Sequence, residues 1–250
     1  MTVRLSTGLR NALAQGLGFM GVMARGSIQI YSGTQPINAD QAPGGTLLGT
    51  VTLSSAALTQ ETRGSASFTL SGTSGTVNSI TVSGLNIIPN EVITYTDSLT
   101  NTAALVAAAV NRCGVFTATS SGAVVTIRPR PGTGAAYNGL AVVVNTTTLS
   151  ATAPGNITGG VTPVNGLTLV LSDTGVVSKS GTWSFSGITG GTAGWFRYIA
   201  SEYDDGSVTG PARMDGSIGS SGADMVLSNL NIAAAAPNTI DSFSFTVPIQ

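Results

Sequence analysis

Apolar and polar residues alternate along most of the chain, and this period of two predicts β-strands. The alternation is clearest in TWSFS, where Trp183 and Phe185 share one face, and in SFSFTVPI, where Phe243 and Phe245 do. Large aromatic side chains dominate the cores of packed sheets, so we expect all four to lie in one core. Strands of this group are expected at 27–31, 47–53, 65–70, 167–171, 182–186, 194–203, 223–232 and 242–249.

These strands form no βαβ unit, so the pattern favours a mainly β fold. The specific expectation is an antiparallel β-sandwich that resembles a jelly roll. Within it, 167–171 (LTLVL) is an uninterrupted apolar run, which is typical of a buried strand. In 223–232 the apolar positions change phase after Leu227, as a β-bulge would cause.

The middle of the chain has a different pattern of apolar and polar residues and contains one strong helix signal. In SLTNTAALVAAAVNRCG (98–114), Thr100 or Asn101 can cap the start, Arg112 falls in the last turn, and Gly114 can stop the helix. The turn SGAV joins FTATS to VTIRP with the chemistry of a β-hairpin. Strands around the helix are expected at 79–87, 92–96, 116–129 and 140–149.

Gly-rich and Ser-rich segments bound this middle stretch, which suggests domain boundaries. We therefore expect a small α+β domain at 73–162, inserted into a loop of a β-sandwich body made of 27–72 and 163–250. The alternative is one elaborate sandwich whose helix is a crossover connection.

Residues 1–26 form a third segment, expected to be an N-terminal helical arm. Leucines recur every four residues, which predicts a short amphipathic helix with one apolar stripe. The apolar run after Arg10 also resembles a signal peptide, but glycines interrupt it and it is too short to span a bilayer. Such an arm must bury its stripe against its own domain or against a neighbour. We expect a neighbouring subunit, with contacts through Arg4, Leu5, Leu9, Arg10, Leu13 and Phe19.

The low charge of the chain limits the classes of partner that it is expected to bind. Charged residues make up 8% of the sequence, against the usual quarter, and the formal net charge is −1. Such a surface gives no electrostatic attraction to nucleic acid or to anionic lipid. A weakly charged surface rich in Thr, Ser and Gly instead suits close and permanent contact with other subunits.

The inventory of reactive side chains is poor. The chain contains no His, which excludes the Ser/His/Asp and Cys/His catalytic arrangements and the common zinc sites. Cys113 is the only cysteine, so no intrachain disulfide exists, and it is expected to be a small buried apolar residue. No phosphate-binding loop of the GxxxxGK[ST] type is present. We therefore expect neither catalytic residues, nor enzyme activity, nor a cofactor.

Two clusters remain as candidate sites. The acids Asp204, Asp205 and Asp215 lie close together in sequence and are candidate calcium ligands, although Asp-Asp-Gly between strands is also a common hairpin turn. On a strand, Trp195 would face away from Tyr198, so one face belongs to a core. The other face either belongs to a core as well, which is the favoured interpretation, or makes an aromatic contact with a partner. The Arg-Pro-Arg-Pro motif at 128–131 is expected to mark a strand end.

Several segments share a characteristic order of Gly turns and short strands. Near the ends of the chain they are LSTGLRNAL, GSIQIYSGTQP, LLGTVTL, GWFRYIA, ARMDGSIGSSGADMVLSN and IDSFSFTVP. In these segments the sequence resembles virion structural proteins of tailed bacteriophages. Within 73–162, NTAALVAAAVN, FTATSSGAVVTI and PGTGAAYNGLAVVV resemble a module of phage head and tail proteins.

The resemblance implies a structural subunit of the virion, assembled in the cytoplasm of a bacterial host, where a lone cysteine is usual. Its first implication is a capsid decoration protein bound to the major capsid shell. Its partners would be other copies of itself and other virion proteins, with no nucleic acid and no membrane. A neck, tail or tail-tube subunit in a ring is the alternative. A glycan-binding fibre module, with Trp195 and Tyr198 stacking on sugar, is an alternative of another class.

Overall fold

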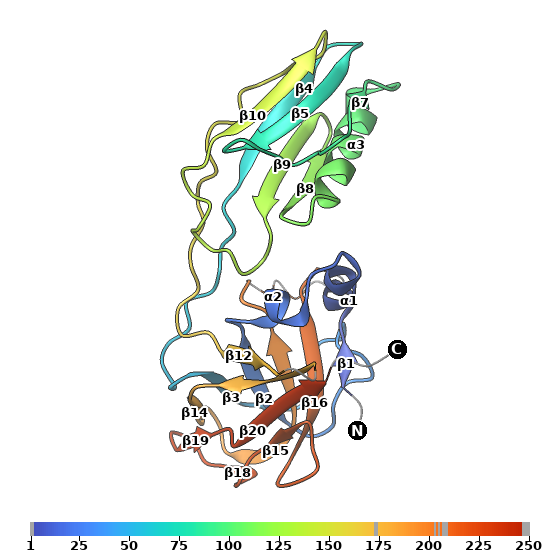
Figure 1. Cartoon of the computed structure of the whole chain (residues 1–250). Helices are drawn as coiled ribbons and strands as arrows, with labels where there is room; N and C mark the ends of the chain where they lie inside the picture. Colours follow the sequence, from blue (N-terminus) through green and yellow to red (C-terminus); the bar gives the residue numbers. More distant parts are fainter. Residues whose placement is uncertain (1–2, 173–174, 203, 205, 207–209, 247–250) are drawn as a thin grey trace. The chain divides into compact units, whose positions relative to one another are not determined.

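A computed structural model describes residues 3–172, 175–202, 204, 206 and 210–246 (Figure 1). The chain divides into two compact units, unit 1 (Met1–Glu61 and Pro163–Gln250) and unit 2 (Thr62–Thr162). The fold is mainly β, as predicted. Among the described residues, no helix is both long enough and apolar enough to cross a bilayer.

Unit 1 contains two short helices and most of the strands. In chain order its elements are β1 (Arg4–Leu5), α1 (Thr7–Ala14), α2 (Phe19–Met23), β2 (Ser27–Ser32), β3 (Leu47–Leu53), β12 (Thr168–Leu171), β13 (Val176–Ser180), β14 (Trp183–Ser186), β15 (Gly191–Ile199), β16 (Arg213–Gly219), β17 (Met225–Val226), β18 (Asn231–Ile232), β19 (Pro237–Thr239) and β20 (Ser242–Thr246).

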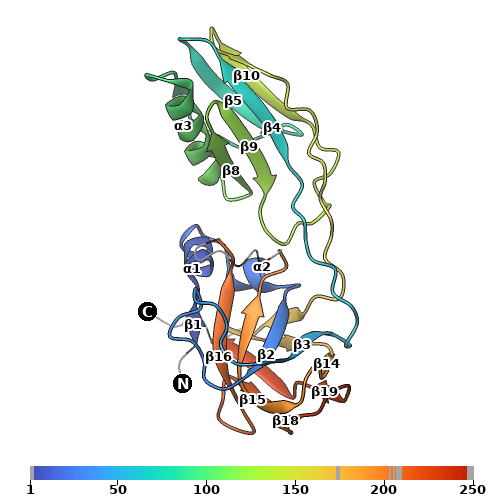
Figure 2. The ribbon, with the colours of Figure 1, turned by 180° about the vertical axis from the view of Figure 1, so that it is seen from behind.

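The strands of unit 1 form one curled sheet, with the order β12-β13-β20-β17-β16-β15-β2-β3-β14-β19. β1 pairs with β16, β18 pairs with β15, and the described pairs are antiparallel except β16 with β17. Figure 2 shows β2, β15 and β16 side by side, although they come from opposite ends of the chain. The curl brings strands from the two halves of the sheet together around one core.

The predicted aromatic core is confirmed for three of its four members. Trp183, Phe185 and Phe243 are buried in the core of unit 1, and the ring centroids of Trp183 and Phe243 lie 5.2 Å apart. Phe245 is only half-buried and packs at the margin of this core. Its ring stacks on Phe19, with a centroid distance of 4.5 Å. The C-terminal strand therefore holds the second helix against the sheet.

The N-terminal segment is part of unit 1 and not a detached arm, which corrects the expectation for residues 1–26. Leu9 and Phe19 are buried in the core of unit 1, while Leu5 and Leu13 are partly buried against it. The expected contact of these leucines with a neighbouring subunit is replaced by contact with the unit's own sheet. Of the six expected interface residues, Arg10 is the exposed one.

A side-chain cap and a close backbone contact determine the sequence at the start of α1. Ser6 caps α1, since its Oγ accepts a hydrogen bond from the Leu9 N–H at 3.2 Å. A Cβ on Gly8 would lie 2.4 Å from the backbone oxygens of Gly210 and Pro211, so only glycine allows the helix to approach that backbone.

Strand 167–171 differs from its expectation. Leu167 is fully buried, but Val170 is 50% exposed and Leu171 is 57% exposed. The reason is position, because β12 is the last strand at one edge of the sheet. Val170 and Leu171 of this edge strand therefore lie beyond the core, in which the sequence pattern had predicted them.

Unit 2 consists of one helix and two small antiparallel sheets. Its elements are β4 (Ala66–Ser71), β5 (Thr76–Val82), β6 (Leu85–Asn86), β7 (Ile93–Thr94), α3 (Leu99–Asn111), β8 (Phe116–Ser121), β9 (Val124–Pro129), β10 (Val142–Thr147) and β11 (Ser150–Ala151). The sheet orders are β10-β5-β6, with β7 on β5, and β11-β4-β9-β8. The predicted hairpin is present as β8 and β9, and α3 packs on both (Figure 2).

The boundary of unit 2 lies earlier than the expected residue 73. β4 was assigned to the body, but Ala66, Phe68 and Leu70 are buried in the core of unit 2. The helix also begins earlier than expected, with Ser98 as its cap, because the Ser98 Oγ accepts from the Asn101 N–H at 3.1 Å.

The end of α3 covers the outer edge of β8. The Asn111 side chain donates to the Ala118 carbonyl at 3.0 Å and accepts from the Ala118 N–H at 2.9 Å. The Cys113 Sγ accepts from the Phe116 N–H at 3.2 Å, so this half-buried thiol has a polar contact that its apolar interpretation missed. Arg130 is buried where β9 ends, and it donates to the Asn111 carbonyl at 3.2 Å.

Candidate functional site

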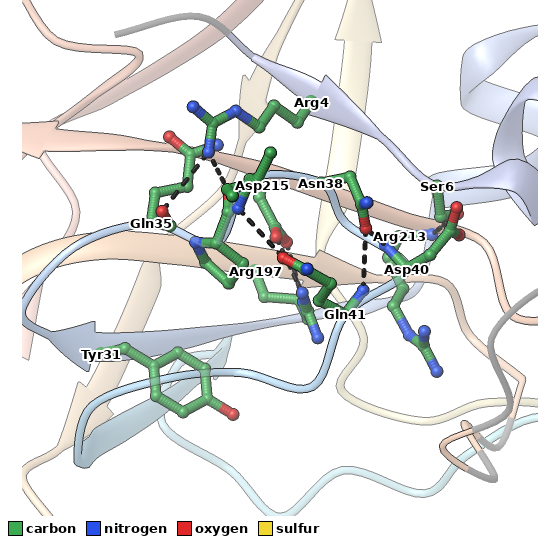
Figure 3. A network of polar contacts seen from close by, with 12 residues as sticks. Arg4, Ser6, Tyr31, Gln35, Asn38, Asp40, Gln41, Arg197, Arg213 and Asp215 are labelled. Atoms are coloured by element: carbon green, nitrogen blue, oxygen red, sulfur yellow. Dashed lines mark hydrogen bonds and ion pairs between the residues drawn. The ribbon is translucent and has the colours of Figure 1, made fainter.

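A row of polar side chains crosses four strands of unit 1. The register aligns Gln29 of β2, Arg197 of β15, Asp215 of β16 and Arg4 of β1. The opposite faces of β15 and β16 supply Phe196, Tyr198, Met214 and Ile218 to the core. The row therefore lies on the outer face of the sheet, where segments from elsewhere in the chain cover it (Figure 3).

The central contact of the row is the ion pair between Arg197 and Asp215. The guanidinium donates through Nε and Nη2 to the two carboxylate oxygens, and both distances are 2.8 Å. The exposed fractions of the two side chains are 3% and 0%. Burial raises the pKa of Asp215, an effect that the hydrogen bonds from Arg197 oppose. The guanidinium also lies 5.6 Å from the ring centroid of Trp195, within the range of a cation–π contact.

A second ion pair joins Arg213 of β16 to Asp204. The guanidinium contacts both oxygens of the Asp204 carboxylate, and the Gly206 N–H donates to the same carboxylate at 2.9 Å. Burial alone raises the pKa of Asp204, but the hydrogen bonds from Arg213 and Gly206 outweigh it and hold this pKa below its usual range.

The N-terminal segment and the loop 35–43 are held against this face. The Arg4 guanidinium donates to the Pro36 carbonyl. The Asp40 carboxylate accepts from the Thr7 N–H at 2.8 Å and from the Thr7 hydroxyl at 2.7 Å. Ser6 exchanges backbone and side-chain hydrogen bonds with Arg213 (Figure 3). The network therefore ties the start of the chain to a strand about 200 residues later.

These residues surround a cavity of about 250 Å³ in unit 1. Its lining consists of Gln29, Tyr31, Asp40, Gln41, Ala42, Pro43, Arg197, Ile199, Asp204, Gly206 and Arg213. The Tyr31 hydroxyl, whose pKa burial raises, donates to the Gln29 amide oxygen at 2.8 Å. No described lining residue is a serine, threonine or cysteine that a neighbouring base could activate.

The charges around the cavity compensate one another. The charged side chains among the described lining residues are Arg197 and Arg213 on one side and Asp40 and Asp204 on the other, two of each sign. Such a balance offers no excess charge to an ionic ligand. The arrangement is suited to holding segments together.

The predicted calcium site does not form among the described residues. Asp204 and Asp215 each bind an arginine, so their oxygens face guanidinium groups instead of a shared space. Asp205 lies outside the described residues. The part of the chain that the structure describes contains no group of three or more metal-ligating side chains.

The burial of Trp195 and Tyr198 agrees with the interpretation that both faces of the strand are covered, and not with an exposed aromatic contact. Trp195 and Tyr198 face opposite sides of β15, as expected, but both are fully buried. Trp195 stacks on Tyr31 with a centroid distance of 4.6 Å, while the ring of Tyr198 packs against Trp183 and Phe243. Neither ring has a free face on which a sugar could stack.

Large apolar side chains are instead exposed elsewhere on both units. In unit 1 the exposed set is Ile37, Val164, Val170, Leu171 and Ile188, and in unit 2 it is Leu85, Val92, Leu105, Val115, Val124, Val143 and Val161. Ile37 is 81% exposed and lies in the loop that covers the polar row.

Sequence reasoning missed the strand at the centre of this site. The apolar pattern does not predict β16 (RMDGSIG), because Arg213, Asp215 and Ser217 occupy alternate positions on a face that is nevertheless buried. The alternation itself was the available signal, with Met214, Gly216 and Ile218 between them. Comparison of this chain with protein-family models, with curated proteins and with solved structures finds no match.

Proposed function

We propose that this chain is a structural subunit of a tailed-bacteriophage virion, and specifically a capsid decoration protein that binds the major capsid shell. The observation that carries the proposal is the distribution of polarity. Arg197, Asp215, Arg213 and Asp204 of unit 1 pair in a covered network, while large apolar side chains such as Ile37 and Leu171 are exposed. Exposed apolar residues on a weakly charged surface favour lasting contacts between subunits.

The same distribution favours a structural role over catalysis. The cavity combines paired ions with amide and phenol groups, and its described lining offers no activated nucleophile. The chain contains no His, and the Cys113 thiol contacts the backbone of β8. We therefore propose that the protein is not an enzyme and requires no cofactor.

The sequence resemblance supplies the assignment to a virion, and the structure supplies the physical fit. The partners would be further copies of this chain and other virion proteins, and assembly would take place in the cytoplasm of the bacterial host. We also retain the interpretation of unit 1 as a jelly-roll-like sandwich, with the two halves of the curled sheet as its layers. The contact between Trp183 and Phe243 across the core supports it.

A neck, tail or tail-tube subunit in a ring is the second candidate, because exposed apolar residues suit any closed assembly. A glycan-binding fibre module has lost its supporting observation, since Trp195 and Tyr198 are buried.

Adding the purified chain to capsid shells that lack it tests the proposal. A decoration protein binds such shells to saturation and co-sediments with them. A matched variant, Ile37→Ser, replaces the most exposed apolar side chain of the covering loop. Because Ile37 lies outside the core, the variant should fold like the parent, so weaker binding of the variant to the shells would reflect a lost contact and not a loss of structure. Absence of co-sedimentation at saturating protein would reject the capsid assignment in favour of the neck or tail.

A further inference from the structure

The edge strand β12 has unpaired backbone groups and exposed apolar side chains. The Ser172 N–H donates to the Val176 carbonyl at 2.9 Å, which identifies these residues as a hydrogen-bonded pair of the β12–β13 hairpin. Such pairs recur at every second residue, so Val170 and Thr168 also bond to β13. Leu169 and Leu171 therefore direct their N–H and C=O groups away from β13.

The neighbouring backbone confirms this direction. Leu167 has the same parity, and its N–H and C=O bond to Gly26 and Arg25 on the side away from β13. Within the described residues, the N–H and C=O groups of Leu169 and Leu171 on that side have no hydrogen-bonding partner. Val170 is 50% exposed beside them. Four backbone groups are thus free at this edge.

Two other sheet edges of the molecule are protected. At the opposite end of the unit 1 sheet, β19 is three residues long and begins with Pro237, which has no N–H to offer. In unit 2, the side chains of Asn111 and Cys113 occupy the outer edge of β8. Edges are normally blunted by proline, by charge or by a covering group, but TLVL carries none of these.

We infer that β12 pairs with β12 of a second copy of this chain, antiparallel and about a two-fold axis at Val170. The register is self-complementary. With Val170 opposite its own counterpart, Leu169 faces Leu171 of the other copy, and each supplies the free N–H and C=O that the other needs. Leu167 would come next, but its outward groups are already bonded, so the pairing stops at four hydrogen bonds.

The side chains agree with this arrangement. Val170 and its counterpart form a non-hydrogen-bonded pair, whose Cα atoms lie about 4.5 Å apart and whose side chains touch. The four residues of β12 carry no charge, so self-pairing brings no like charges together. Each half-exposed valine then loses water-accessible apolar surface, and an isologous contact closes on itself.

The contact is a small protein–protein interface. Such an interface has low affinity in isolation and is strengthened by neighbouring contacts. The inference rests on the proposed function only in expecting many copies to meet at high local concentration. It is therefore tested on the purified full chain without any particle, so that its failure leaves the virion assignment standing.

Disulfide trapping gives the test. Val170→Cys is made together with Cys113→Ser, and the matched control is Thr168→Cys in the same background. Thr168 is exposed on the same face of β12 as Val170. A pair of Cα atoms about 4.5 Å apart is within the range that a disulfide bridges, whereas the two copies of residue 168 lie about 13 Å apart along the strands.

Mild oxidation at ~100 μM should convert Val170→Cys to a covalent dimer at least ~10-fold faster than Thr168→Cys, on a non-reducing gel. Adding Leu171→Pro removes one N–H from each copy, and so two of the four hydrogen bonds of the contact, but leaves the hydrogen bonds to β13 intact, so trapping should fall to the control level. Equal rates for the two cysteine variants, no dimer from Val170→Cys, or no effect of Leu171→Pro would each overturn the inference.

Discussion

Arg197 and Asp215 form a bidentate ion pair across β15 and β16, with both nitrogen–oxygen distances at 2.8 Å and both side chains almost completely buried. Ionic groups removed from water are costly unless each is paired, and here the pairing is complete. The pair occupies the centre of a network that ties the N-terminal segment to the sheet. Its loss should therefore affect the folding of unit 1.

Asp215→Leu should lower the free energy of unfolding of unit 1 by about 3–5 kcal/mol, because it leaves the Arg197 charge buried without a partner. The double variant Arg197→Met with Asp215→Leu should lose less than either single variant, since no unpaired charge remains. Both tryptophans of the chain, Trp183 and Trp195, lie in unit 1, so denaturation followed by tryptophan fluorescence reports this unit alone. A double variant as unstable as the sum of the two singles would contradict the argument.

The second ion pair gives a prediction about pH. The pKa of Asp204 is lower in the folded protein than in the unfolded chain, so its ionised form stabilises the fold. This contribution is fully present above the ordinary carboxylate range near pH 4 and is lost as the pH falls through the folded pKa. Asp204→Asn should therefore destabilise unit 1 at pH 7, and the difference from the parent should shrink towards pH 2. A difference that does not depend on pH would show that the ion pair contributes nothing.

The two phenylalanines of β20 should differ in importance. Phe243 is buried against Trp183, Phe196 and Tyr198, so Phe243→Ala should cost about 3–5 kcal/mol. Phe245 is half-buried and stacks on Phe19, so Phe245→Ala should cost only about 1–2 kcal/mol. Denaturant unfolding of the two variants gives the comparison. Equal losses would place Phe245 in the core after all.

The two units should fold independently, because each has its own hydrophobic core. Thr62 and Val161 form a β-bridge at the base of unit 2, so a short Gly/Ser linker can replace 62–162 and join the ends at small entropic cost. The shortened chain should keep the cooperative fluorescence transition of the parent within about 1 kcal/mol. Loss of that transition would show that the units depend on each other.

Much of the fold could be predicted from periodicity alone. The segment 47–53 coincides with β3, and the hairpin of the middle stretch lies where the pattern placed it. The helix lies within the expected 98–114, although it begins earlier than its expected cap. In these elements the residues that enter the core are apolar and regularly spaced, so the period of the sequence reports the geometry directly.

The prediction failed where burial involves polar groups or glycine. β16 has Arg213 and Asp215 on its covered face, and each becomes compatible with burial only through a partner distant in sequence. A Cβ on Gly216 would lie 2.5 Å from the Phe196 ring, so glycine serves close packing inside the strand.

The candidate site was only partly predicted, because its charged residues also depend on partners that are distant in sequence. Asp204 and Asp215 were identified as a cluster of acids, but the arginines that neutralise them are on β15 and at the start of β16. A sequence shows the spacing of acids along one chain segment, whereas the register that brings Arg197 opposite Asp215 exists only in the folded sheet. The leucine stripe of residues 5–13 was likewise identified, but not the surface that it covers.

The central claim is that this chain is a structural protein of the virion, and the number of copies in each purified particle tests it most directly. Quantitative mass spectrometry of purified particles of the phage proposed to encode the chain, calibrated on the major capsid protein, gives this number. The account predicts hundreds of copies per particle, as a decoration protein requires in order to cover a shell. A few dozen copies or fewer would assign the chain to the neck, tail or fibre, and its absence from purified particles would contradict the virion role itself.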